Sequence, residues 1–160
     1  MRESNFWKWL RNGWRLEGPS LQVTRIETGT MTGVPDVEVC YEGTAFWVEL
    51  KAVDRPVRPD TPVDVGLSPA QSLWHRKRMA AGGTSYLLVA VGDRQERRLY
   101  LLRGEVVATA VTEDIRWVRR GDSFSMTEDD LMAVSVCNQR SSAPTLLKIM
   151  TSDLYGGYTR

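Results

Sequence analysis

The residues of this sequence with the clearest capacity for chemistry are two carboxylates and one ammonium group. Asp36 follows Pro35, and after twelve further residues the chain continues with Glu49, Leu50 and Lys51. If the intervening segment folds back, Asp36, Glu49 and the Leu50 carbonyl form an all-oxygen set that suits Mg²⁺ or Mn²⁺. Such a cation lowers the pKa of a bound water, and Lys51 would meet the charge that grows in the transition state. The pattern predicts metal-assisted hydrolysis of a phosphodiester.

Two predicted strands must bring these groups together. Residues 34–41 and 45–52 read as strands joined by a hairpin turn at Gly43. Because side chains alternate along a strand, Glu49 and Lys51 project from one face, and the start of the first strand lies opposite the end of the second. The second strand also carries apolar side chains on both faces, which predicts a central strand. Charges at the end of such a strand call for a functional reason.

The remaining elements are predicted from periodicity and caps. We expect a helix over 3–12, a strand over 21–27, an irregular proline-containing loop over 54–66, a helix from Pro69 to Ala81 capped by Ser68, and an apolar strand over 85–91. Further on we expect a hairpin of residues 97–102 and 105–111, a helix that starts at Glu128 after Thr127, an apolar segment at 146–150 that packs on the core, and a frayed tail at 155–160.

Composition excludes several classes of protein. The chain has 160 residues, of which 42% are hydrophobic and 26% charged, as expected for a single globular domain. Its longest apolar run is too short for a membrane span, and no secretory signal is visible, so we expect a cytoplasmic protein. A virus-encoded protein that acts in the host cell is the secondary possibility. Two cysteines indicate neither a disulfide framework nor zinc, and a net charge of +1 means that any nucleic acid must be attracted by local basic patches.

Pro35-Asp36, Glu49-Leu50-Lys51 and the downstream Gln71 resemble the motifs of the PD-(D/E)xK nuclease superfamily. The layout looks like its Holliday-junction-resolvase-like and virus-type replication–repair (VRR-Nuc) branches, over about residues 3–91. The resemblance implies an α/β, restriction-endonuclease-like core at 1–92, with a mixed central β-sheet flanked by helices. Residues 93–160 would form a C-terminal extension with an added β-hairpin and a helical segment. Asp36 and Glu49 would be metal ligands, and Lys51 the catalytic lysine.

Two further residues have both a functional and a structural explanation. Glu3 matches the extra carboxylate that some relatives place on the first helix as a metal ligand, but an acid in a first turn also complements the helix dipole. Gln71 matches a glutamine beside the metal centre, and it also completes a capping box with Ser68.

The expected DNA contacts come from the strand over 21–27, the glycine-rich loop over 29–33, the proline-containing loop and the helix after it. They are Arg25, Thr30 and Thr32; Arg55 and Arg58; and His75, Arg76 and Arg78. Gln71, His75 and Arg78 share one face of the helix, which we expect to point toward the carboxylates, with Leu73, Trp74 and Ala81 on the buried side. The alternative for these residues is a solvated helix face, a turn and a flexible connector.

The predicted function is a divalent-metal-dependent DNA endonuclease that acts on branched or flapped intermediates. Paired cuts across a symmetrical junction would require a homodimer. Two alternatives stay open. The chain could be a non-catalytic nucleic-acid-binding protein that retains the fold, or a nuclease of another substrate class, such as an exonuclease, a restriction-like enzyme or an enzyme that acts on RNA.

Overall fold

The computed structural model describes residues 2–27, 31–112 and 114–156. Its helices and strands are α1 (Glu3–Trp14), β1 (Leu21–Arg25), β2 (Val37–Tyr41), β3 (Thr44–Val53), β4 (Val63–Leu67), α2 (Pro69–Ala80), β5 (Ser85–Val91), β6 (Arg98–Arg103), α3 (Gly104–Ala108), β7 (Val118–Arg120), β8 (Ser123–Met126), α4 (Glu128–Val134) and α5 (Ala143–Gly156), with short 3₁₀ turns at Arg15–Ser20, Arg94–Glu96 and Thr109–Thr112. None of the described helices is long and apolar enough to cross a membrane.

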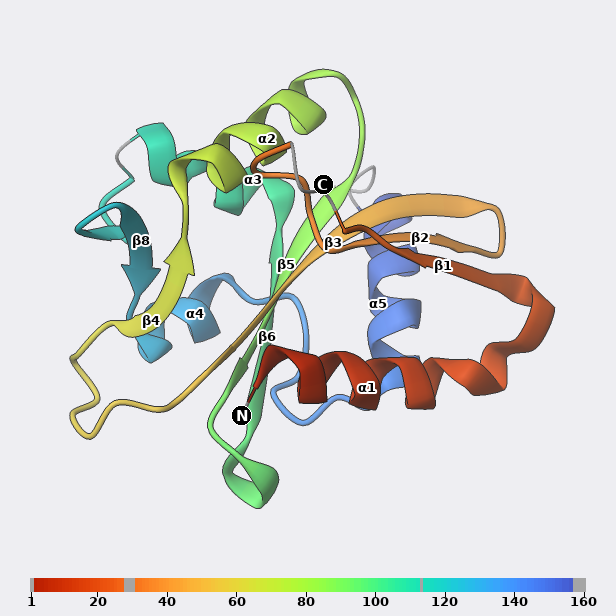
Figure 1. Ribbon diagram of the computed structural model, residues 1–160, viewed down its shortest axis with the longest axis horizontal. Coiled ribbons are helices and arrows are strands. Elements are labelled where there is room, and N and C mark those ends of the chain that lie inside the picture. Colours follow the sequence, from red (N-terminus) through yellow and green to blue (C-terminus); the bar gives the residue numbers. More distant parts are fainter. Residues whose placement is uncertain (1, 28–30, 113, 157–160) are drawn as a thin grey trace.

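A mixed five-stranded sheet forms the centre of the molecule. Its strand order is β1-β2-β3-β5-β6, and the pairing is antiparallel except between β3 and β5. β3 is therefore the central strand, as its apolar residues on both faces predicted. The strand β4 and the helix α2 make the crossover from β3 to β5 (Figure 1).

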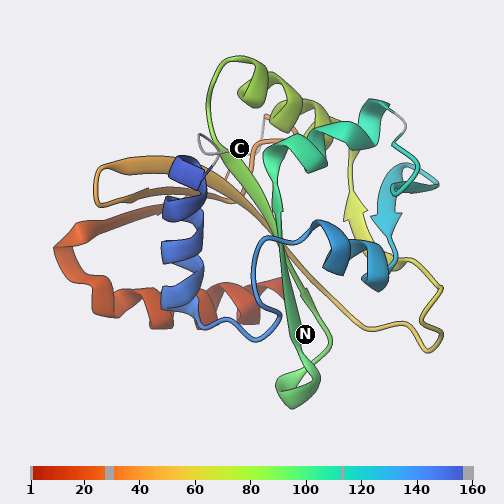
Figure 2. The same cartoon turned by 180° about the vertical axis from the view of Figure 1, so that it is seen from behind.

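Each face of this sheet carries its own apolar core. On one face, α1 and α5 pack on side chains such as Val48 and Leu88. On the other, β4, β8, α3 and α4 pack on side chains such as Leu87 and Val89, as Figures 1 and 2 show from opposite sides. The predicted α/β fold with a mixed sheet flanked by helices is confirmed. So is the packing of residues 146–150 on the core, because Leu146, Leu147 and Met150 are buried there.

The predicted loop over 54–66 is wrong in its second half. Val63, Val65 and Leu67 alternate as buried residues in β4, which pairs with β8 in a separate three-stranded sheet of order β4-β8-β7. The register shifts between Val63 and Leu67, and Gly66 there has a φ of 63°, a backbone conformation that glycine adopts without a Cβ clash. The partner of β4 lies about sixty residues away in sequence, so local patterning does not reveal it.

The predicted hairpin over 97–111 is also wrong in its second strand. Residues 104–108 form α3, and a 3₁₀ turn follows, with Val107 and Ala110 buried. Val106 and Val107 favour a strand by propensity, but burial at a helical spacing against α2 overrides it. A hairpin does exist in the C-terminal extension, formed by β7 and β8. The predicted cap of α4 is confirmed, because the Thr127 side chain accepts a hydrogen bond from the Asp130 N–H.

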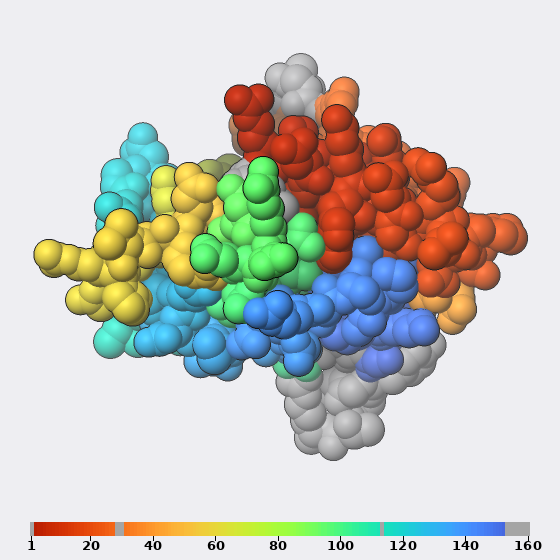
Figure 3. Space-filling model, turned by 90° about the horizontal axis from the view of Figure 1, so that it is seen from below, coloured from red at the N-terminus to blue at the C-terminus, as the bar shows by residue number. Residues whose placement is uncertain are grey.

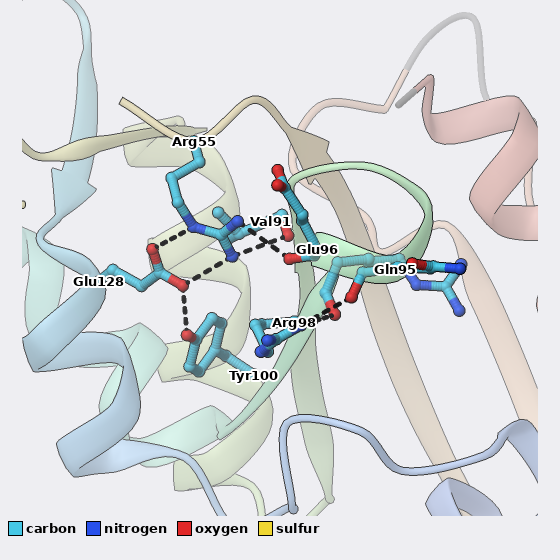
Figure 4. Close-up of polar contacts among 8 residues, drawn as sticks. Arg55, Val91, Gln95, Glu96, Arg98, Tyr100 and Glu128 are labelled. Carbon is cyan, nitrogen blue, oxygen red and sulfur yellow. Dashed lines mark hydrogen bonds and ion pairs between the residues drawn. The ribbon is translucent and has the colours of Figure 1, made fainter. Parts of the chain in front are cut away.

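The first part of the β3–β4 connection is held by a polar cluster (Figure 4). Arg55 donates through Nε and Nη2 to the two carboxylate oxygens of Glu128, at 2.8 and 3.1 Å, and through Nη1 to the Glu96 carbonyl. Tyr100 donates its hydroxyl to the same carboxylate. Arg55 thereby ties the chain after β3 to α4 and to the β5–β6 connection.

Candidate active site

The β2–β3 hairpin brings Asp36 beside Glu49. The antiparallel ladder ends with Val37 opposite Val48, so Asp36 directly precedes the last pair and Glu49 directly follows it. Asp36 Oδ2 accepts a hydrogen bond of 2.8 Å from the Leu50 N–H. Proline has no N–H to donate to a ladder, which fits the end of the pairing at this point. The Pro-Asp sequence thus lies where the β2–β3 pairing ends, and the Asp36 carboxylate, rather than a backbone carbonyl, accepts the hydrogen bond from the Leu50 N–H.

Glu49 is nearly fully buried, with 3% of its surface exposed. Its Oε1 accepts a hydrogen bond of 2.8 Å from Gln71 Nε2, while its Oε2 is buried with no hydrogen-bond partner. Burial and the negative charge of Asp36 raise the pKa of Glu49 to about 9, although Lys51 opposes the shift. A buried carboxylate oxygen without a donor and with a second carboxylate beside it is a place where a cation is strongly favoured.

Lys51 lies on the same face of β3 as Glu49. Its Nζ donates to the Gly66 carbonyl at 3.3 Å, and its positive charge partly offsets the rise in the pKa of Glu49 and of Glu3. The carbonyl of Gly66, which the sequence reading missed, therefore holds the lysine. Its role depends on a strand whose pairing is entirely non-local.

Glu3 lies in the first turn of α1 and faces the same cluster from a distance. Burial and the charge of Asp36 raise the pKa of Glu3, and its carboxylate lies 4.0 Å from Arg25. Within the described residues, no group of three or more Asp, Glu, His or Cys side chains is arranged to hold a metal ion. Glu3 is therefore not gathered with Asp36 and Glu49 into a three-carboxylate set.

The donors that remain fit a hard cation. They are the carboxylates of Asp36 and Glu49 together with the carbonyl of Leu50, all of them oxygens. The unpartnered Oε2 of Glu49 is the observation that supports this assignment. An ion with such a donor set keeps several water molecules in its coordination shell, as Mg²⁺ commonly does.

Gln71 both caps α2 and contacts Glu49. Ser68 accepts from the Gln71 N–H, and the Gln71 side-chain oxygen accepts from the Ser68 N–H, which completes the capping box. The amide nitrogen of the same side chain then donates to Glu49. The cap orients the amide, so the start of α2 fixes one oxygen of the buried carboxylate.

The predicted DNA contact through His75 is wrong. His75 is fully buried, its Nδ1 lies 2.6 Å from the Ser85 hydroxyl, and burial lowers its pKa to about 4. The buried side of α2 carries Ser72 and His75, whereas Leu73 is 41% exposed. The expected buried side was wrong because α2 packs on α3 and β5 through small and polar side chains, which hydrophobic periodicity does not detect.

The other basic residues of α2 differ in their surroundings. Arg76 is exposed. Arg78 lies over the rings of Trp74 and Trp47, at 4.7 and 5.5 Å from their centroids. The two tryptophan rings are themselves 5.4 Å apart. Arg78, Trp74 and Trp47 thus contact one another and join α2 to β3, and no simple sequence pattern indicates this cluster.

Some of the remaining predicted DNA contacts are exposed, and others already interact with another side chain of the protein. Arg58 and Thr32 are exposed, and Thr30 lies outside the described residues. Arg25 lies over the Trp7 ring and near Glu3. The guanidinium of Arg55 is bonded to Glu128 and to backbone carbonyls, and its contact with DNA stays a prediction.

Comparison with solved structures identifies related folds. A Holliday junction resolvase, Hjc of Archaeoglobus fulgidus, aligns with a TM-score of 0.51 and 13% identity over 81% of this chain and 92% of that chain. A VRR_NUC domain aligns with a TM-score of 0.39 and 20% identity over 69% of this chain and 95% of that chain. No family model and no curated protein matches the sequence. The resolvase alignment confirms the predicted restriction-endonuclease-like fold.

Proposed function

We propose that this protein is a divalent-metal-dependent endonuclease that hydrolyses phosphodiester bonds of DNA. The observation that carries this proposal is the cross-strand pair of carboxylates, Asp36 and Glu49, at the end of the central strand. The unpartnered buried oxygen of Glu49 and the lysine beside it complete the set. Two adjacent acidic side chains, one of them buried, are costly without a cation, because burial and the charge of Asp36 both disfavour the ionised form of Glu49.

Each residue of the cluster has a separate role in the proposed reaction. Asp36, Glu49 and the Leu50 carbonyl would hold Mg²⁺ or Mn²⁺, which when bound supplies Lewis acidity toward the phosphate and lowers the pKa of a bound water. Lys51 offers its ammonium group to a non-bridging phosphate oxygen or to the attacking water, and the Gly66 carbonyl limits its movement. Gln71 keeps Glu49 in one orientation and so keeps Oε2 free.

The substrate that we propose is branched or flapped DNA. The aligned resolvase acts on Holliday junctions according to its name, and it shares the fold of this chain. One copy of the chain has one catalytic cluster and cuts one strand. Symmetrical paired cuts would need two copies related by a two-fold axis.

Incubation of the purified chain with labelled four-way junction, flap, duplex and single-stranded DNA tests the proposal. Reactions contain Mg²⁺, Mn²⁺ or a chelator, with RNA substrates in parallel. We expect metal-dependent cutting of the branched substrates that disappears in Asp36→Ala and Lys51→Ala. Asp122→Ala, an exposed carboxylate between β7 and β8, is the control and should cut normally. Binding without cutting under every metal would instead support a non-catalytic binding protein.

A further inference from the structure

Three arginine side chains gather where the β5–β6 connection meets the segment before α5. A cavity of about 200 Å³ is lined there by Trp9, residues 94, 95, 97 and 99, and residues 139–142. Figure 3 shows this face, on which α1 (red), the β5–β6 connection (green) and the chain that leads into α5 (blue) come together. Three segments that are distant in sequence therefore build one hollow.

The charges in this cavity are all of one sign. Arg94, Arg97 and Arg140 line it, and no carboxylate does. Among the described residues, none of these three guanidinium groups is ion-paired with an acidic side chain. Arginines gathered without a counter-charge repel one another and raise the local concentration of anions.

Arg97 is held in place rather than extended into solvent. Its guanidinium lies 4.2 Å from the centroid of the Trp9 ring, and Trp9 in turn stacks on Phe6. Burial lowers the pKa of Arg97, but a guanidinium group keeps its positive charge in proteins at physiological pH. A planar guanidinium fixed on an aromatic ring presents its donors in one direction, as bidentate recognition of a phosphate requires.

The start of α5 adds donors on the same side of the cavity. This helix of 14 residues begins directly after Ser142, whose hydroxyl accepts a hydrogen bond from the Thr145 N–H. The positive end of the helix dipole therefore lies beside the three arginines. It reinforces the arginine cluster and favours an anion at this place.

A neighbouring cavity leads from the arginines to the start of α1. It has a volume of about 700 Å³, shares Arg94 and Arg97, and extends to Arg2 and Asn5 at the start of α1. Arg2 directly precedes Glu3 in sequence, and the charges of Asp36 and Lys51 both affect the pKa of Glu3. Asp54 and Asp93 also line this larger cavity, so a phosphate fits the smaller cavity better.

We infer that Arg94, Arg97 and Arg140 form a second phosphate site, which binds the backbone of the DNA substrate at a distance from the scissile bond. This inference rests on the proposed action on DNA. Contacts to backbone phosphates position a nucleic acid without reading its sequence. The site would fix the direction in which one arm of the substrate leaves the catalytic cluster.

The test is a binding measurement on the full-length chain in a chelator, so that no substrate is cut. Fluorescence anisotropy of labelled duplex and junction DNA is recorded over a range of salt concentrations for the natural chain, Arg94→Gln/Arg140→Gln and the control Arg120→Gln. Arg94 and Arg140 are exposed, so their replacement should leave the fold intact, and Arg120 is an exposed arginine of β7 in the separate three-stranded sheet. Each lost phosphate contact should reduce the slope of log K against log salt by about 0.9 and cost about tenfold in affinity near 0.1 M salt.

Unchanged affinity and slope in the double variant, or an equal loss in Arg120→Gln, would overturn the inference. Inorganic phosphate provides a second arm. If it raises the melting temperature of the natural chain but not of the double variant, while DNA binding is unchanged, the cavity takes free phosphate and the DNA assignment is wrong. Failure of the proposed function has a different signature, namely no cutting under any metal while the arginine-dependent binding persists.

Discussion

Gln71 Nε2 lies 2.8 Å from Glu49 Oε1, so the first turn of α2 holds one oxygen of the buried carboxylate while the other has no partner. This contact joins two elements that the chain separates by more than twenty residues. It explains how a residue that caps a helix can also serve the end of the central strand. It also determines which oxygen of Glu49 is left for a ligand.

Replacement of Glu49 by Gln should abolish cleavage and stabilise the metal-free protein. The folded protein keeps Glu49 protonated up to a pKa of about 9, whereas an unfolded chain releases that proton near 4.5. Between these values the folded state binds more protons, so the free energy of unfolding in a chelator falls as pH rises. Glu49→Gln stays neutral and should lose this pH dependence. Thermal unfolding in a chelator from pH 5 to 9 checks this, and a variant that cuts at the natural rate would refute the ligand assignment.

Replacement of Lys51 by Met should reduce cleavage by about a hundredfold to a thousandfold, because one preformed donor to the developing charge is lost. Lys51 is not a proposed ligand, so Mg²⁺ should still raise the melting temperature of the variant. Single-turnover cleavage together with thermal unfolding separates the two effects. Lys77→Met, an exposed lysine of α2, is the matched control. Loss of the Mg²⁺ effect in Lys51→Met would contradict the division of roles.

His75 should make the protein sensitive to acid without contributing to cleavage. Its pKa is about 4 in the folded state and 6.5 when unperturbed, so the unfolded state binds more protons between these values. The free energy of unfolding should therefore rise with pH across this window, by up to about 3 kcal/mol. This rise should be complete above pH 6.5. Urea unfolding at pH 4.5 and 7 measures this.

His75→Gln tests the same residue from the other side. The variant should lose most of that pH dependence and, at neutral pH, cut DNA at the natural rate once folded. A selective loss of DNA binding in this variant, with unchanged stability, would show that the histidine reaches the substrate after all.

Arg55 and Arg58 should behave differently although both belong to the same connection. Arg55→Ala leaves Glu128 without its bidentate partner and should lower the free energy of unfolding by about 2 kcal/mol. Arg58 is exposed, and its replacement by Ala should change stability by less than about 0.5 kcal/mol. Unfolding of both variants in guanidinium chloride checks this contrast. Equal stabilities would mean that the polar cluster of Figure 4 does not hold the β3–β4 connection.

The sequence alone predicted much of the catalytic half of the molecule because that half is built from local signals. The strands of the β2–β3 hairpin and the turn between them follow from alternation and from Gly43, and the capping box at Ser68 and Gln71 marks where α2 begins. The motif residues Asp36, Glu49 and Lys51 therefore could be placed at one end of a hairpin. That end is where the structure has them.

The tertiary structure decided everything that depends on partners distant in sequence. The pairing of β4 with β8 turned a proline-containing loop into a strand and placed the Gly66 carbonyl beside Lys51. Packing of α2 on α3 and β5 buried His75, one of the residues expected to contact DNA. The arginine cavity likewise combines residues 9, 94–97 and 139–142, which no local pattern relates. Local propensity and periodicity specify short elements, whereas the free energy of burial is shared among residues that only the folded chain brings together.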